Sequence, residues 1–173
     1  FNLWQDQTHV RGLLRRTSLE IYQSGQPDWD TILDVDALAT QEGENWVYKG
    51  SVCLEPDYAK CLLRLSRGGT DASVYREFDM HTKSFVPDGF VMPEAKSGVA
   101  WVDENKLLVG TNWGEGTLTA SGYPRQTKLW RRGEPLENAK LIFEGEAPDV
   151  GVWPARFGRR EIDGMGAEPI LLI

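Results

Sequence analysis

The sequence consists of short strand-like runs that recur about every fifty residues, and it shows almost no helical periodicity. Segments that open a unit with a hairpin lie 48 and 51 residues apart, centred near Val52, Ala100 and Gly151. Short strands that close a unit lie 53 and 57 residues apart, near Ile32, Phe85 and Ile142. A unit of this size, with about four strands, matches one β-propeller blade of roughly 40–50 residues. The period therefore predicts an all-β fold, a partial β-propeller of about three to four blades, each a four-stranded antiparallel sheet.

The predicted strands are bounded by turn signals along the whole chain. Residues 46–54 and 59–66 flank a Glu-Pro-Asp turn, and 98–102 and 106–110 flank an Asp-Glu-Asn turn, so each pair predicts a hairpin. One short helix is expected at 34–41. The other expected strands are 11–22, 31–34, 73–80, 84–86, 125–132, 140–144, 150–156 and 167–172.

The period also sets the expected domain organisation, a single fragment of a propeller domain over residues 1–173. Its expected units are a partial blade at about 1–45, blades at about 46–93 and 94–147, and a partial blade at about 148–173. A β-sandwich is the structural alternative, because evenly spaced short strands also suit that fold. The period favours the propeller. In several strands, as at Leu62, Leu63 and Leu65, the period-2 alternation is blurred, which indicates sheets packed on both faces.

Charge and hydropathy exclude several classes of partner. The chain has 26 acidic residues against 19 Lys and Arg, a net charge of −7, which argues against nucleic acid. No run approaches 18 apolar residues, so no transmembrane helix is expected. No signal peptide is visible. Because Phe1 is not an initiator residue, we expect the chain to be cut from a longer protein.

The sequence contains no convincing catalytic or metal site. A Gly-x-Ser-x-Gly motif is absent, and the two histidines, His9 and His81, are expected to be solvated or locally hydrogen-bonded. Asp34 and Asp36 resemble the start of a calcium loop, but Leu38 holds the third ligand position and Asn45 the position of the bidentate Glu, so helix capping is the expected role of both. The prediction is no catalytic residue, no cofactor-binding residue and no metal ligand, and hence no cofactor.

Two further features have both a structural and a functional interpretation. The loop at 110–122 is rich in glycine but lacks the dinucleotide-binding pattern, so it is either a recognition loop or a long surface connection. Cys53 and Cys61 straddle the turn centred on Asp57 and are expected to lie opposite each other in a hairpin. With no sign of secretion, we expect them to be reduced and mostly buried thiols.

Seven tryptophans and three arginine pairs remain to be explained. Several tryptophans occupy similar positions in successive units, which favours packing between blades over a sugar-binding platform. The arginine pairs are expected on solvated faces. The tryptophans are Trp4, Trp29, Trp46, Trp101, Trp113, Trp130 and Trp153, and the pairs are Arg15-Arg16, Arg131-Arg132 and Arg159-Arg160.

Several segments, in order, resemble the propeller domain of the prolyl oligopeptidase family of serine peptidases. The most specific stretch is 65–72 (LSRGGTDA) followed by 76–79 (REFD). The likeness extends over residues 2–152 and weakens afterwards. The other matching segments are 11–19 (RGLLRRTSL) with Tyr22, 33–39 (LDVDALA), 44–47 (ENWV), 110–111 (GT), 121–125 (SGYPR) and 143–146 (FEGE).

The resemblance implies a large peptidase in which a seven-bladed propeller caps an α/β-hydrolase domain and keeps folded proteins from its Ser-Asp-His triad. No triad residue can be placed on this chain, so the implied function is a non-catalytic propeller portion that gates peptides to an absent catalytic domain. The implied partners are that domain and peptide substrates. The implied location is the cytosol, with the periplasm as the alternative. The rival function is a free-standing propeller-like module for ligand or protein binding.

A cut ring also predicts self-association. Half a propeller would expose two blade faces and unpaired strand edges, which normally mark interfaces. Covering them would be favourable at roughly 25 cal/mol per Å² of apolar surface. We therefore expect association of the fragment with a second copy.

Overall fold

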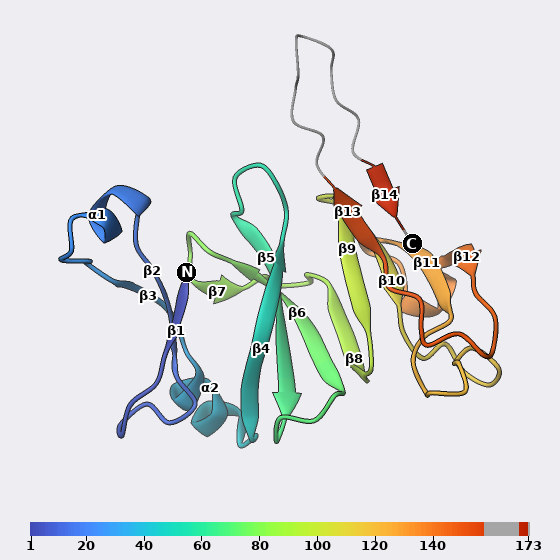
Figure 1. Ribbon diagram of the computed structural model, residues 1–173, viewed down its shortest axis with the longest axis horizontal. Helices are drawn as coiled ribbons and strands as arrows, with labels where there is room; N and C mark the ends of the chain where they lie inside the picture. The colour runs from blue at the N-terminus through green and yellow to red at the C-terminus, as the bar shows by residue number, and fades with distance from the viewer. Residues whose placement is uncertain (158–169, 173) are drawn as a thin grey trace, which may run out of the picture.

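The computed structural model describes residues 1–157 and 170–172, which fold into antiparallel sheets standing side by side (Figure 1). The first sheet has three strands, the next has five and the third has four. This arrangement confirms the all-β prediction of a partial propeller. In the described part of the chain, the longest helix has eight residues, and no helix is long and apolar enough to cross a membrane.

The first sheet has the order β1-β2-β3, and two short helices follow its strands. Helix α1 begins inside the segment 11–22 that was expected to be one strand. That expectation was wrong because Ser18 caps the helix by accepting a hydrogen bond from the Ile21 N–H. The elements are β1 (Asn2–Trp4), β2 (Leu13–Arg16), α1 (Leu19–Gln23), β3 (Asp30–Asp34) and α2 (Val35–Glu42).

Helix α2 confirms the expected helix, with different roles for its two aspartates. Asp34 is the N-cap and accepts from the Ala37 N–H at 2.9 Å. Asp36 does not cap the helix, because its carboxylate accepts from the backbone N–H groups of Arg11 and Gly12 and so joins the helix to the segment just before β2. The helix ends at Gly43, whose φ of 66° is the left-handed conformation that glycine adopts without strain.

The second sheet confirms the hairpin over the Glu55-Pro56-Asp57 turn. Its order is β4-β5-β6-β7, and β8 pairs with the other end of β6. Strand β8 was not predicted, because it contains Pro93, a residue that sheets accept on edge strands. The strands are β4 (Trp46–Cys53), β5 (Lys60–Arg67), β6 (Ser73–Asp79), β7 (Ser84–Phe85) and β8 (Val91–Ala95).

The third sheet has the order β12-β11-β10-β9 and contains the second predicted hairpin, β9 with β10. A two-stranded sheet of β13 and β14 follows it, with β13 beside β9. Residues 158–169 and 173, which include the Arg159-Arg160 pair and part of the predicted strand 167–172, lie outside the described residues. The elements are β9 (Gly98–Asp103), β10 (Lys106–Gly110), β11 (Gln126–Arg131), the 3-10 helix η1 (Leu136–Asn138), β12 (Lys140–Glu144), β13 (Ala155–Phe157) and β14 (Ile170–Leu172).

The core lies between the sheets. Strand β5 sends Leu62 toward the third sheet, while Leu63 on its other face packs with Leu14 and Ile32 of the first sheet. Strand β5 is thus buried on both faces, with the adjacent Leu62 and Leu63 turned to opposite sides, as expected for stacked blades.

Candidate functional site at the inner edge of the sheets

Strands β4, β9 and β13 lie side by side and form what we call the inner edge of the sheets (Figure 1). Strands β4 and β9 are the first strands of their sheets, and in a propeller the first strands surround the central channel. The indole Nε1 of Trp101 in β9 donates to the Val52 carbonyl of β4 at 2.8 Å. At Gly98 a side chain would meet the Trp153 ring at 3.1 Å, so glycine allows this close approach.

An aromatic cluster fills the space between the second and third sheets. Phe90 packs edge-on against Trp101 and Trp130, with ring centroids 5.8 and 4.8 Å apart. Trp101 is only 2% exposed. Burial between sheets confirms the packing role for these two tryptophans, whereas Trp4 and Trp153 are about half exposed.

A buried ion pair crosses the same junction. The Glu77 side chain in β6 is 1% exposed, and its two oxygens accept from both terminal nitrogens of Arg132 at 2.8 and 2.9 Å. Glu77 also accepts from the Phe90 N–H, and the Arg132 guanidinium stacks over the Phe90 ring at 4.5 Å. The expectation that Arg132 lies on a solvated face was therefore wrong, because the carboxylate that partners it is 55 residues away in the sequence.

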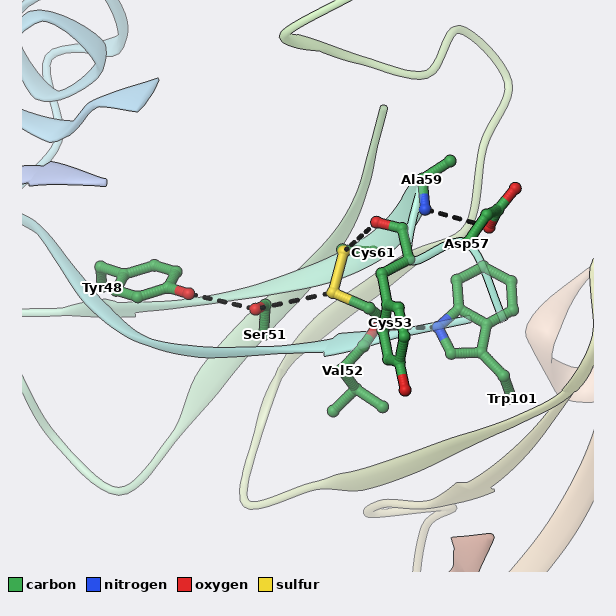
Figure 2. The surroundings of a disulfide bond; sticks show 9 residues. Tyr48, Ser51, Val52, Cys53, Asp57, Ala59, Cys61 and Trp101 are labelled. Carbon is green, nitrogen blue, oxygen red and sulfur yellow. Dashed lines mark hydrogen bonds between the residues drawn. A yellow bond between two sulfur atoms is a disulfide. The ribbon is translucent and has the colours of Figure 1, made fainter. Parts of the chain in front are cut away.

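A disulfide joins Cys53 and Cys61 across the β4–β5 hairpin (Figure 2). The predicted juxtaposition of the two residues is confirmed, but the predicted reduced thiols are wrong. The two cysteines are directly opposed in register, which brings their sulfur atoms together. Figure 2 also shows Trp101 reaching Val52, the residue next to Cys53, so the bond lies beside the junction of the sheets.

Alkylation of the unfolded, unreduced protein is expected to modify no cysteine, and prior reduction should give two modified thiols. Replacing both cysteines by serine should lower the free energy of unfolding by about 2–3 kcal/mol, because the bond restricts a short loop of the unfolded chain. Mass spectrometry and urea unfolding measure the two effects. Two modified thiols without reduction would contradict the bond.

The other sequence candidates lie apart from this junction. His9 contacts Asp6 at 3.1 Å, and two backbone N–H groups on the Asp6 carboxylate, first that of His9, lower the pKa of Asp6. His81 is exposed in the β6–β7 turn. Within the described residues, neither histidine hydrogen-bonds to a serine, threonine or cysteine side chain. The same part of the chain holds no cluster of three potential metal ligands.

The glycine-rich loop at 110–122 folds back on the third sheet. The Trp113 indole donates to the Gln126 carbonyl at 3.2 Å, and Arg125 donates to the Gly116 carbonyl at 2.9 Å. These contacts make the loop a structured surface connection next to β11. Both ends of the loop come near the inner edge: the Thr111 hydroxyl hydrogen-bonds to the Ser97 hydroxyl at 2.7 Å, and the ring of Tyr123, the residue that follows the loop, packs on Trp153 at 5.7 Å.

Glu77 and Arg64 are the important residues that sequence reasoning did not single out. Glu77 and Arg64 each stand inside a strand whose neighbours on the chain are mostly buried. A charged residue in a run of that kind usually has a partner, and this is the signal that could have identified both.

The comparisons with known proteins agree with this architecture. Residues 1–157 match the family model of the prolyl oligopeptidase N-terminal β-propeller domain. An uncharacterized peptidase of Sinorhizobium fredii is 52% identical over 163 residues, covering 94% of this chain and 22% of that protein. An uncharacterized peptidase of Rickettsia prowazekii is 31% identical, covering 83% of this chain and 21% of that protein.

A solved structure shows the same fold in a longer chain. The structure of a post-proline cleaving enzyme from Rickettsia typhi matches with a TM-score of 0.80 and 30% identity, over 88% of this chain and 23% of that one. The chain thus spans less than a quarter of the length of these relatives. The family match and the relatives agree with the observed sheets. This chain belongs to the prolyl oligopeptidase family and is part of the N-terminal β-propeller region of such a peptidase.

Proposed function

We propose that this chain is a steric part of a larger serine peptidase, in which the propeller restricts the access of polypeptides to a catalytic α/β-hydrolase domain. The observation that supports it best is the junction between the second and third sheets. There the Trp101 indole joins the two first strands through the Val52 carbonyl, and the Glu77–Arg132 pair joins β6 of the second sheet to the end of β11 of the third. Two sheets held together in this way separate rarely. A propeller whose sheets separate rarely excludes large molecules from its central channel.

The proposal also explains why the candidate residues for chemistry are dispersed. A steric role needs buried contacts between blades and needs no nucleophile paired with a base. The chain by itself is then expected to give only the background rate with a proline-containing chromogenic peptide. In the larger protein, the partners would be the catalytic domain and the peptides that it cleaves.

The size selectivity of a protein that joins this chain to its catalytic domain tests the role. The change is Arg132→Met, which removes the partner of Glu77 and should raise the population of open junctions. We expect kcat/KM for a polypeptide of thirty residues to rise at least about tenfold relative to that for a tetrapeptide. Measuring both substrates in one preparation makes the short one an internal control for the catalytic domain.

The matched control is Arg131→Met, which changes an exposed arginine one position earlier. It should leave the ratio of the two kcat/KM values unchanged. The gating role would be wrong if Arg132→Met opened the junction, as judged by faster hydrogen exchange at β9, and the ratio still stayed at its original value.

The disulfide bears on where such a protein works. Of the two locations expected from the sequence, the periplasm is the oxidising one, and disulfides persist there while cytosolic thiols are kept reduced. We therefore propose the periplasm in place of the cytosol. Alkylation of the protein in intact cells, before lysis, would show two reactive thiols if this assignment were wrong.

A further inference from the structure

A cavity of about 280 Å³ opens at the inner edge, between the second and third sheets. We call it the Arg64 pocket, and its polar lining includes Arg64, Lys96 and Tyr75. Its apolar walls come from Val52 and Val99 on the two first strands and from the ring of Trp153. The pocket therefore combines cationic and apolar surfaces at the place where β4, β9 and β13 meet.

Arg64 is a charged residue near the middle of a strand whose neighbours on the chain are buried. It lies in β5 opposite Gly50 and Tyr75, on the face that also carries buried Leu62. Its Nε donates to the Ser73 hydroxyl at 3.1 Å, and within the described residues no carboxylate lies within ion-pair distance of its guanidinium. A partly buried guanidinium has a large desolvation cost unless an anion approaches its remaining donors.

Lys96 adds a second positive charge, and Asp71 is the one carboxylate among the described residues that line the pocket. The Lys96 Nζ is 3.9 Å from Asp71, a carboxylate that is 70% exposed, and it lies over the Tyr123 ring at 4.5 Å. The Tyr75 hydroxyl donates to the Ser97 carbonyl at 3.1 Å, and burial raises the pKa of Tyr75, so this phenol stays neutral. The pocket is thus locally cationic in a chain whose net charge is −7.

We propose that the Arg64 pocket binds a carboxylate that carries a small apolar group. The two terminal nitrogens of a guanidinium form a fork that matches the two oxygens of a carboxylate. Lys96 supplies a second charge, and Val52, Val99 and Trp153 provide surface for the apolar group. A carboxylate of this kind is found at the C-terminus of a short peptide and in free carboxylic acids. The proposed binding does not depend on the gating role.

Titration of small ligands into the protein at low ionic strength tests the proposal. The readouts are the NMR signals of the backbone amides and of the Trp153 indole. The probes are acetyl-dialanine with a free carboxylate, the same peptide as its C-terminal amide, isovalerate and inorganic phosphate. We expect saturable binding of the carboxylates in the millimolar range and none of the amide. Tighter binding of the peptide acid than of isovalerate would identify a peptide C-terminus as the ligand, and the reverse order would identify a free acid.

Three variants locate the binding. Arg64→Met should weaken the Kd at least about tenfold, because it removes a charge-assisted bidentate contact. Lys96→Met should weaken it about threefold, since Lys96 contributes one partly screened charge. Lys49→Met removes an exposed charge of β4 and should leave the Kd within about a factor of two.

The outcomes that overturn the proposal are equally specific. They are an absence of saturable binding of both carboxylates, equal binding of the acid and its amide, binding of phosphate alone, or an unchanged Kd in Arg64→Met. If Arg64→Met does not fold, Lys96→Met decides the question, because Lys96 lies between β8 and β9 and its side chain is 37% exposed. An unchanged Kd in that variant would then overturn the proposal.

Discussion

Replacing Arg132 by methionine is expected to lower the free energy of unfolding by about 3–5 kcal/mol, because it leaves the buried Glu77 carboxylate without its cationic partner. Of the donors to the Glu77 carboxylate in the described part of the chain, the Phe90 N–H would then remain. Methionine keeps much of the aliphatic volume of arginine, so the loss reports the missing charge more than a cavity. Urea unfolding followed by circular dichroism measures it.

A second substitution separates the ion pair from the rest of the junction. In the double variant Glu77→Gln with Arg132→Met, the amide oxygen can still accept from Phe90, and no buried charge is left. We therefore expect the double variant to be more stable than Arg132→Met alone, by about 1–3 kcal/mol.

The control for the ion pair is Arg131→Met, whose arginine is exposed. It should change the free energy of unfolding by less than about 0.5 kcal/mol. Equal losses in Arg131→Met and Arg132→Met would show that the pair does not stabilise the junction.

Replacing Trp101 by alanine should cost a similar amount, about 3–5 kcal/mol, through loss of packing. The indole is 2% exposed, packs on Phe90 and donates to the Val52 carbonyl. Its removal leaves a cavity between two sheets, and the strands on both sides limit how far the site can collapse. The same urea titration gives the value.

Two other variants show how much of that cost is specific to the junction. Trp101→Phe keeps most of the apolar volume and loses the hydrogen bond, so we expect a loss of about 1–3 kcal/mol. Trp4→Ala, at a tryptophan that is 45% exposed, should cost about 1 kcal/mol. If Trp4→Ala and Trp101→Ala destabilised the protein equally, the packing between sheets would not be the source of the effect.

The junction and the Arg64 pocket together give the inner edge two different properties. Buried contacts such as Trp101 with Phe90 hold the second and third sheets together, and beside them Arg64 and Lys96 carry positive charge. Unfolding measurements therefore test the packing between the second and third sheets, and carboxylate titration tests the charged surface of the Arg64 pocket.

The strands and hairpins were predictable from the sequence because their signals are local. Turn residues and short apolar runs located β4, β5, β9 and β10 to within two residues at each end, and they placed Cys53 opposite Cys61. The internal period then indicated stacked blades. Local signals failed where another local interaction competed, as with the Ser18 cap of α1, or where a rule has an exception, as with Pro93 in β8.

The candidate site depended on contacts between residues far apart in the chain. Arg132 meets Glu77 across 55 residues, and Trp101 meets Val52 across 49, so no window of neighbouring residues contains either contact. The strand pattern placed Arg64 inside β5, but only the packing of the sheets showed which cavity its side chain lines. The sequence by itself thus determined the blades, because turns and strand patterns act over a few residues. Only the tertiary structure decided the junction and the pocket, because both arise from the way one sheet faces the next.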